Sequence, residues 1–338
     1  MKKKLLITGS QGFLGNLAKD HFANLFEISC IDLVVDEGQN VFQVDVTDFN
    51  KLEKVIEKIR PNIILHFASE IFDTYNKDKI FRTNVNGTHN LYKCAEKYNV
   101  EHFIFTSTFS IFERDYSYLI PEDEPASCKN YYGISKVETE RFLLSSKCKM
   151  NIIIFRCPII VDASRVHRLG VLFEFLKDNC TLWILGKGEN KLQFVSANDL
   201  FIAIEKSLNL EGKKIFNIGC DKISSIKQTF EFLKKQTNSK SKIRHFNKNI
   251  GLMFLKVLSK LRLINFIDYH HKIMVSNIVM DISSIKKELN FSPSKSTEQL
   301  MLDAYFYYTE DKNKKMSGSS RKPKMGFFKV IKFFSKFI

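Results

Sequence analysis

Short apolar runs alternate with longer amphipathic stretches over the first 156 residues of the chain. The segments between most of the apolar runs repeat their apolar residues with helical spacing, notably Lys51–Ile59, Lys77–Tyr98 and Asn130–Ser146. Strands and helices in alternation predict an α/β fold with a doubly wound parallel sheet, covered by helices on both faces. Such strands are apolar almost throughout, and six runs fit this description: Lys3–Thr8, Glu27–Asp32, Phe42–Asp45, Asn62–Phe67, His102–Ser107 and Asn151–Arg156.

A glycine-rich turn directly follows the first predicted strand. Gly9, Gly12 and Gly15 occur in the spacing G-x-x-G-x-x-G and lead into an amphipathic stretch. Glycines there permit a tight turn and let a pyrophosphate approach the backbone at a helix N-terminus. A glycine trio alone also marks ordinary turns, so the dinucleotide interpretation depends on further residues.

Two carboxylates at the ends of the next strands supply that support. Asp32 ends the second predicted strand roughly 20 residues after the glycines, where a carboxylate accepts hydrogen bonds from the adenosine ribose and repels a 2′-phosphate. This favours NAD over NADP. Asp45 ends the third predicted strand, where a carboxylate could meet the adenine amino group; a helix cap or loop carboxylate is the alternative.

Tyr132 and Lys136 stand four residues apart at the start of a predicted helix, so their side chains share one face. A neighbouring ammonium favours the ionised form of a phenol, which suits Tyr132 to acid–base catalysis. The pattern Y-x-x-x-K is common by chance, and a surface Tyr and Lys are the alternative. The fifth predicted strand favours the catalytic interpretation, because it carries Thr106, Ser107 and Thr108 at its carboxyl end, where ligands bind in open α/β sheets.

The net charge of +15 is concentrated at the end of the chain, where residues 312–338 carry nine Lys or Arg and no Asp or Glu. This placement predicts an appended interaction segment and no nucleic-acid groove. Residues 311–324 have the composition of a flexible linker. As a helix, residues 325–338 would be basic and amphipathic, which favours peripheral contact with an anionic membrane; packing on the protein's own surface or on a partner is the alternative.

The cellular setting follows from cysteines and apolar segments. Seven scattered cysteines include no C-x-x-C pair, so the sequence encodes neither a disulfide framework nor a zinc site, and we expect no metal. The apolar run behind the N-terminal lysines is too short for a signal peptide, and no segment approaches the ~20 apolar residues of a membrane-spanning helix. We expect a cytoplasmic protein whose tail contacts the inner face of the membrane.

The chain resembles the extended short-chain dehydrogenase/reductase superfamily and, within it, the NAD-dependent sugar epimerase/dehydratase group. The resemblance covers almost everything to about residue 310 and lies in an ordered series of motifs. These motifs are T-G-x-x-G-F-L-G (Thr8–Gly15), H-F-A-S (His66–Ser69), N-x-N-G-T (Asn84–Thr88), F-I-F-T-S-T (Phe103–Thr108), Y-G-x-S-K (Tyr132–Lys136), R-C-P (Arg156–Pro158), G-x-G-x-N-x-x-Q-F-V-S-x-x-D-L (Gly186–Leu200), F-N-I-G (Phe216–Gly219) and D-I-S-x-x-K-x-E-L-x-F-x-P (Asp281–Pro293).

The resemblance implies a role for individual residues. Tyr132 would be the catalytic acid and base, Lys136 its ribose-binding partner, and Thr108 the hydroxyl that hydrogen-bonds the reacting substrate oxygen. Asn84 is expected to tie backbone segments together. The residues that would bind NAD, besides Tyr132 and Lys136, are Gly9, Gly12, Phe13, Leu14, Gly15, Asp32, Asp45, Val46, Phe67, Ala68 and Pro158.

The resemblance also implies a division of the chain. Residues 1–165 would form a Rossmann-like NAD-binding domain, and residues 166–310 a smaller C-terminal α/β substrate lobe, with some strand exchange between them. Residues 251–266 are apolar and basic and are expected to form a core or pocket helix of that lobe. Family members are commonly homodimers through helices corresponding to Lys77–Tyr98 and Asn130–Ser146, so a homodimer is expected.

The chain departs from the family's dehydratases and epimerases at specific positions. Related 4,6-dehydratases carry Asp-Glu after the catalytic Thr, whereas Phe109 and Ser110 follow Thr108 here, which disfavours dehydration. Epimerases usually have V-Y-G, an Asn and a phosphate-clamping Arg where this chain has Ile111-Phe112-Glu113, Ile159 and Leu192. Lysine does not replace the bidentate fork of that arginine. Charge could come instead from Lys187, Lys191, Arg165 and Arg168, or these residues could be solvated surface.

Three functions therefore remain open. The first is an NAD-dependent epimerase or oxidoreductase acting on a hydroxyl-bearing carbon of a nucleotide sugar. The second resembles the 3β-hydroxysteroid dehydrogenases and oxidises or reduces a lipid or another small alcohol. The third, disfavoured by the intact Thr108, Tyr132 and Lys136, is a non-catalytic NAD-binding scaffold.

Overall fold

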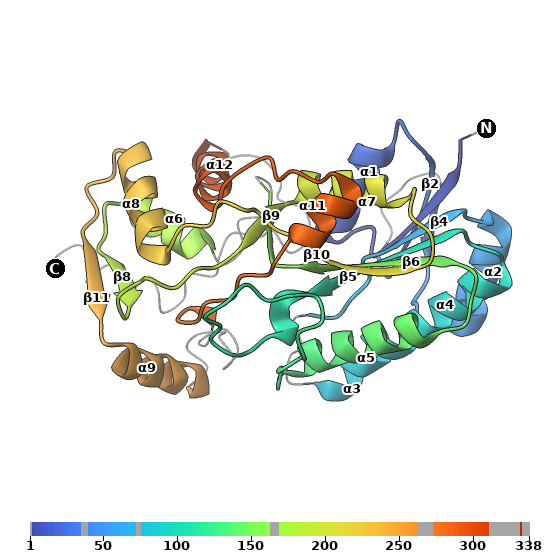
Figure 1. The fold of residues 1–338 in the computed structure, drawn as a ribbon, viewed down its shortest axis with the longest axis horizontal. Coiled ribbons are helices and arrows are strands. Elements are labelled where there is room, and N and C mark those ends of the chain that lie inside the picture. The colour runs from blue at the N-terminus through green and yellow to red at the C-terminus, as the bar shows by residue number, and fades with distance from the viewer. Residues whose placement is uncertain are drawn as a thin grey trace.

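A seven-stranded parallel sheet occupies one end of the molecule, at the right in Figure 1. The computed structural model describes residues 2–34, 40–71, 76–162, 169–261, 273–310 and residue 332. The strand order is β10-β6-β5-β4-β1-β2-β3, which reverses direction at β1 as doubly wound sheets do. The strands are β1 (Lys4–Thr8), β2 (Glu27–Asp32), β3 (Val41–Gln43), β4 (Ile63–His66), β5 (His102–Thr108), β6 (Asn151–Cys157) and β10 (Lys213–Asn217).

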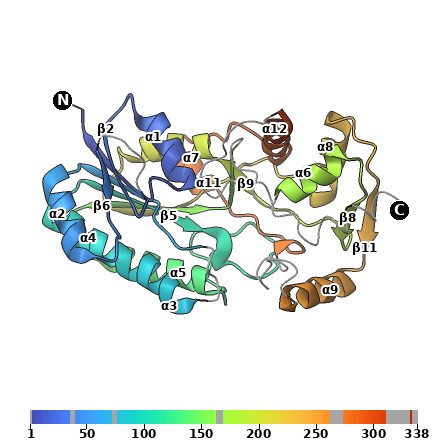
Figure 2. The same cartoon turned by 180° about the vertical axis from the view of Figure 1, so that it is seen from behind.

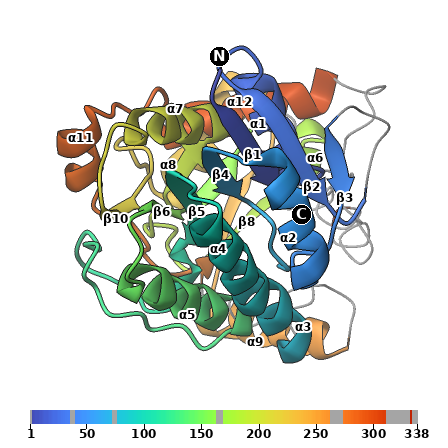
Figure 3. The ribbon, with the colours of Figure 1, turned by 90° about the vertical axis from the view of Figure 1, so that its right-hand side faces the viewer.

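Helices cover both faces of this sheet, which confirms the predicted fold class (Figure 3). One face is covered by α1 (Phe13–Phe22), α7 (Ala197–Ser207) and α11 (Ser283–Leu289), and the other by α2 (Phe49–Ile59), α4 (Gly87–Lys97) and α5 (Tyr131–Ser145). Successive residues of β1 point to opposite faces, so Leu5 and Ile7 join one apolar cluster and Leu6 joins the other.

The predicted stretch Lys77–Tyr98 is divided into three parts. It contains α3 (Lys77–Phe81), a π-helical turn η1 (Arg82–Asn86) and α4. Such turns occur frequently at functional sites, and this one places Asn84 in the interior with 2 % of its surface exposed. Periodicity over the whole stretch predicted continuous helix and did not identify the π turn.

A second group of elements packs around its own apolar cluster at the other end of the molecule (Figure 2). It contains two short parallel pairs, β7 with β9 and β8 with β11. The boundary predicted at residue 165 falls outside the described residues and stays a prediction. The bounds are β7 (Ile159–Val161), α6 (Leu169–Lys177), β8 (Leu182–Leu185), β9 (Phe194–Ser196), α8 (Ile226–Gln236), β11 (Ile243–Phe246), α9 (Lys248–Lys260) and α12 (Thr297–Glu310).

Two sequence-based expectations need correction. The third strand ends at Gln43, so Asp45 lies in the loop beyond it. Residues 251–266 were expected to form a core or pocket helix, but α9 spans residues 248–260 and most of its large apolar side chains are exposed to solvent, which contradicts the core position. Residues 262–266 lie outside the described residues, and the pocket position stays a prediction. Only Gly251 and Leu258 of α9 are buried, because the helix contacts the lobe along one narrow edge.

The structure describes only one residue of the predicted C-terminal helix, Lys332. Residues 325–338 lie outside the described residues except Lys332, whose ammonium forms ion pairs with Glu174 at 2.6 Å and Asp178 at 2.8 Å on and just after α6. Of the segments that the structure describes, none is a helix long and apolar enough to cross a membrane.

Candidate active site

The glycine turn between β1 and α1 leaves no room for side chains. A Cβ on Gly9, whose φ is 70°, would lie 2.6 Å from the backbone N of Ala68. A Cβ on Gly15 would lie 2.2 Å from the carbonyl oxygen of Gly9. The helix begins after Gly12 with no side-chain cap and no acidic residue in its first turn, so none of its own side chains occupies its N-terminal N–H groups or opposes its dipole. This cradle fits a pyrophosphate.

Phe13 and Leu14 begin α1 with their side chains turned toward the core. Phe13 belongs to the apolar cluster on this face of the sheet, and Leu14 packs against it. Any contact of these two residues with a dinucleotide would therefore come from the backbone at the start of the helix, which is also how helix N-termini hold phosphates.

Asp32 stands at the end of β2 directly beside the turn. One carboxylate oxygen accepts a hydrogen bond from the backbone N–H of Gln11 at 2.8 Å, and the other accepts one from Val34 at 3.2 Å. Each carboxylate oxygen has two lone pairs, so capacity remains for a ribose hydroxyl. The residue thus both supports the turn and fits the predicted ribose contact.

Asp45 and Val46 occupy the loop after β3. Asp45 accepts a hydrogen bond from the backbone N–H of Thr47 at 2.8 Å, a local turn that matches the loop-carboxylate alternative. Val46 is buried, and a Cβ on Gly87 would lie 2.6 Å from its side chain, so the start of α4 packs tightly against this loop. The proposed adenine contact of Asp45 stays a prediction.

His66, at the end of β4, connects the glycine turn to the π turn. Its Nδ1 lies 2.7 Å from the Thr8 hydroxyl and its Nε2 lies 2.8 Å from the Thr88 hydroxyl. Thr88 donates to the carbonyl of Asn84 at 2.6 Å, so its oxygen accepts from His66 Nε2–H, and Nδ1 accepts from Thr8. This assignment requires a neutral imidazole. The sequence analysis did not predict this series of hydrogen bonds, although His66 and Thr88 both lie in motifs shared with the family.

Burial lowers the pKa of His66 to about 3, and the charge of Lys136 acts in the same direction. In the unfolded chain a histidine titrates at about pH 6.5, so between about pH 6.5 and 3 the unfolded state binds a proton that the folded state does not. The contribution of the neutral His66 to the free energy of unfolding is therefore complete above about pH 6.5 and is lost as the pH falls toward 3. We expect wild type to lose up to ~1.4 kcal/mol per pH unit from this proton below about pH 6.5. Urea unfolding at pH 7 and pH 5 measures this loss. His66→Gln should lose less over the same interval, and an equal loss in both proteins would contradict the assignment.

Lys136 is buried in α5 and reaches the carboxyl end of β5. Its Nζ donates to the carbonyl of Thr106 at 2.9 Å and lies 4.4 Å from the ring centre of Phe105 and 5.8 Å from that of Tyr132. Burial lowers the pKa of Lys136 to about 8, against the opposing effects of Cys157 and Glu140. The structure therefore brings Lys136 and half-buried Tyr132 together at this strand end.

Thr108 ends β5 two residues beyond the carbonyl that Lys136 contacts. Its hydroxyl donates to the Ser110 hydroxyl at 3.0 Å and accepts from the Ser110 backbone N–H at 3.1 Å. Cys157 pairs with Thr108 across the sheet, which places buried Pro158 just past the same edge. The three catalytic candidates thus come from β5 and the first turns of α5.

Two side chains fix the start of α5. Asn130 caps the helix by accepting from Gly133 N–H at 2.7 Å. Glu113 accepts hydrogen bonds from the backbone N–H groups of Lys129 and Asn130, each at 3.0 Å, and from the Asn130 side chain. Glu113 occupies a position at which the chain departs from the epimerase pattern, and here it positions the helix that carries Tyr132.

We expect Glu113→Ala to lower kcat about tenfold with little change in NAD affinity, because a small displacement of Tyr132 is costly for catalysis. Glu113→Gln keeps one acceptor oxygen and should recover most of the rate. Steady-state kinetics with an NAD titration checks both, with exposed Glu138→Ala on α5 as the control. A fall in NAD affinity with unchanged kcat would show that Glu113 does not act through Tyr132.

Asn84 ties backbone segments together, as predicted. Its side-chain oxygen accepts from the Glu70 backbone N–H at 2.7 Å, and its amide donates to Glu70 O at 3.1 Å and to the Ser135 hydroxyl at 3.0 Å. The π turn therefore ties the loop after β4 to α5, one residue before Lys136.

A buried ion pair that the sequence analysis did not predict lies between β5, β6 and α5. Arg156 Nη2 and Glu140 Oε2 are 2.7 Å apart, and both residues are more than nine-tenths buried. Ser107 also donates to Glu140, and Arg156 Nη1 donates to Glu122 O at 2.6 Å. The pair joins β5, β6 and α5, so the arginine of R-C-P serves to hold these elements in register.

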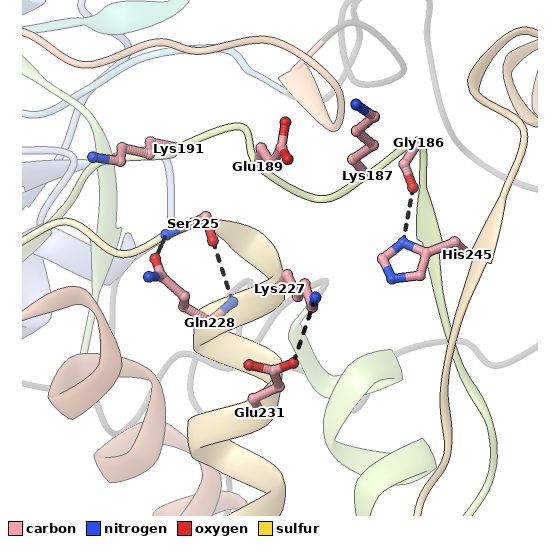
Figure 4. Close-up of a pocket in the computed structure, with 9 residues that line it drawn as sticks. All are labelled: Gly186, Lys187, Glu189, Lys191, Ser225, Lys227, Gln228, Glu231 and His245. Atoms are coloured by element: carbon pink, nitrogen blue, oxygen red, sulfur yellow. Dashed lines mark hydrogen bonds and ion pairs between the residues drawn. The ribbon is translucent and has the colours of Figure 1, made fainter.

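The residues considered as phosphate ligands lie in the C-terminal lobe or outside the described part. Leu192 is buried in the lobe's apolar cluster. Lys187 and Lys191 line an open hollow of about 700 Å³ between the connecting segment that follows β8 and the start of α8, with none of the catalytic candidates in its wall (Figure 4). Arg165 and Arg168 lie outside the described residues.

An open parallel sheet with a glycine turn at β1, a carboxylate at the end of β2 and a Tyr-x-x-x-Lys helix beside β5 defines an α/β protein of the dinucleotide-binding class. The chain belongs to the NAD dependent epimerase/dehydratase family, whose family model matches residues 5–219. It is an enzyme with NAD as its cofactor, as the glycine turn and Asp32 predicted.

Several relatives and solved structures agree with this family. Human dTDP-D-glucose 4,6-dehydratase is 26% identical over 272 residues, covering 72% of this chain and 77% of that protein. The UDP-glucose 4-epimerase of Thermotoga maritima, solved with UDP-glucose, has a TM-score of 0.73 at 20% identity and covers 91% of this chain and 99% of its own. WbmG of Bordetella bronchiseptica, solved with NAD and UDP, has a TM-score of 0.74 at 22% identity, with coverages of 92% and 95%. These structures share the fold.

Proposed function

We propose that this protein is an NAD-dependent epimerase that acts on a hydroxyl-bearing carbon of a nucleotide sugar. The observation that carries the proposal is the position of Lys136, whose ammonium is held at the carboxyl end of β5 beside Tyr132. Structural neighbours that contain UDP-glucose, or NAD with UDP, support the substrate class. The glycine cradle and Asp32 supply the complementary site for the cofactor.

In the proposed reaction Tyr132 removes the proton from the substrate hydroxyl and returns it after the configuration at that carbon has changed. The positive charge of Lys136 stabilises the ionised phenol of Tyr132. The hydrogen bond from Lys136 Nζ to the carbonyl of Thr106 keeps the ammonium in place. Thr108 turns its hydroxyl from Ser110 to the substrate oxygen. NAD, when bound, supplies the acceptor and donor of the hydride.

Dehydration is not part of the proposal, although dehydratases are among the relatives. The two positions after Thr108 carry the buried side chains of Phe109 and Ser110. Neither can act as the carboxylic acid or carboxylate base that elimination of water needs.

Incubating the NAD-loaded protein with UDP-glucose and related UDP-sugars tests the proposed function. We expect an isomeric UDP-sugar to accumulate without lasting absorbance of reduced cofactor. Lasting absorbance with a released keto sugar would show dehydrogenation of the nucleotide sugar instead of epimerisation. Reduced cofactor formed with a steroid or another small alcohol, and with no UDP-sugar, would favour the second candidate, for which the buried Leu192 in place of a phosphate-binding arginine is the specific observation. Neither product with any substrate would favour the scaffold.

Two further properties belong to this proposal. We propose a homodimer through α4 and α5, which rests on family resemblance and is tested by sedimentation velocity. We also propose a cytoplasmic location, which is supported by seven free cysteines. Membrane contact through residues 325–338 stays a proposal, and the ion pairs of Lys332 with Glu174 and Asp178 support its alternative, packing on the protein's own surface.

A further inference from the structure

Helix α9 presents a continuous apolar stripe to solvent. The exposed fractions are 52% for Ile250, 63% for Met253, 48% for Phe254, 50% for Val257 and 62% for Leu261. Their spacings of three, four and seven residues put them on one side of the helix. Scattered exposed apolar residues are normal on protein surfaces, whereas a contiguous stripe of this kind marks an interaction surface.

The stripe is held in place by the adjacent edge of the helix. A Cβ on Gly251 would lie 2.3 Å from Leu185 of β8 and 3.2 Å from the ring of Phe246, so α9 packs closely on the β8–β11 pair. The Phe246 ring in turn meets Trp183 edge-on, with ring centres 6.2 Å apart, and both rings are more than one-third exposed. The apolar surface therefore extends from α9 onto the strands beneath it.

The chain around the stripe is strongly basic. Residues 232–267 carry nine Lys or Arg and no Asp or Glu. Lys248, Lys256 and Lys260 of α9 are exposed, as are Lys242 and Arg244 on and beside β11. An apolar stripe with lysines along it is complementary to an anionic membrane interface, where acyl chains meet phosphate headgroups. A second copy of this surface would place like charges opposite each other, which opposes self-association.

We propose that α9 lies in the plane of an anionic lipid surface, with the stripe inserted among the headgroups and the lysines facing lipid phosphates. Its 13 residues are too few to cross a bilayer, so the contact is peripheral. This inference does not depend on the proposed reaction. It also differs from contact through the C-terminal tail, since it concerns a helix that directly follows β11 and lies more than 50 residues before the tail.

Vesicle co-sedimentation of the full chain tests the proposal. Phosphatidylcholine vesicles with about one-third phosphatidylserine should bind wild type at low salt, and phosphatidylcholine alone should not. Met253→Glu with Val257→Glu should lower the partition coefficient roughly tenfold or more. Leu25→Glu, a single substitution of the same kind at an exposed leucine between α1 and β2, should not change it. Unchanged melting temperature and NAD affinity show that the α9 variant is folded.

The same variants in a chain lacking residues 317–338 separate α9 from the tail. We expect the shortened chain to keep binding that depends on Met253 and Val257. Equal sedimentation of the α9 variant and wild type in both backgrounds would overturn the proposal. Loss of a lipid-free dimer in the α9 variant, seen by sedimentation velocity, would also overturn it by making the stripe a protein interface.

Discussion

Replacing Tyr132 with Phe should reduce turnover by roughly 10²–10⁴-fold while the protein keeps its fold and its NAD affinity. The substitution removes one oxygen and leaves the ring beside Lys136, whose Nζ lies 5.8 Å from the ring centre. The lost rate would reflect the proton that Tyr132 transfers. Single-turnover assays on UDP-glucose, together with NAD titration by fluorescence, measure the two quantities separately.

Tyr131→Phe is the matched control, because Tyr131 precedes Tyr132 in the same helical turn and is 39% exposed. It should retain wild-type turnover. If Tyr132→Phe retains wild-type turnover as well, the catalytic role belongs to another residue and the proposed mechanism is wrong.

Replacing Gly15 with Ala should weaken NAD binding about a hundredfold or more, the second large effect that we expect. The new Cβ would lie 2.2 Å from Gly9 O and 2.5 Å from Ser10 Cα, both backbone atoms that cannot rotate away. The turn must therefore open, and the pyrophosphate cradle opens with it. Isothermal titration with NAD provides the measurement.

Gly12→Ala is a graded comparison within the same turn. Its Cβ would meet Gly9 O at 3.0 Å, and its φ of −72° is open to any residue, so the backbone can remain in place. We expect a smaller loss of NAD affinity than for Gly15→Ala. The reverse order would show that the turn does not hold the cofactor in the way proposed.

Most of the central sheet could be predicted from the sequence because β1, β2, β4, β5 and β6 are largely buried on both faces, whereas β10 was not among the predicted strands of this sheet. β2 has the predicted bounds, and β1, β4, β5 and β6 differ from them by a residue at one or both ends. β3 ends two residues early, since the chain turns into the loop that holds Asp45. An apolar run in the sequence indicates which residues are buried, and in these strands the buried residues extend over nearly the whole strand.

The supporting contacts of the site could not be predicted in the same way. Glu113 and Asn130 are separated by 17 residues, and Arg156 and Glu140 by 16, yet each pair meets through tertiary folding. No local periodicity encodes such a meeting. The hydrogen bonds that connect Thr8, His66 and Thr88 similarly depend on the parallel pairing of β1 with β4.

The expectation for α9 failed for a different reason. A helix with five large apolar side chains usually turns them to the core, and periodicity identifies the apolar face without identifying what covers it. In this fold the core side of α9 is the narrow edge at Gly251 and Leu258. The absence of acidic residues across residues 232–267 was the available signal for the proposed contact of this face with an anionic lipid surface.

The central claim is that the site oxidises and re-reduces the same substrate carbon without releasing the intermediate. Its most direct test uses UDP-glucose deuterated at the carbon that is inverted, with NAD-loaded enzyme and mass spectrometry of the isomeric product. The account predicts that the product keeps the deuterium at that carbon. Product that has exchanged its deuterium for solvent hydrogen would contradict it.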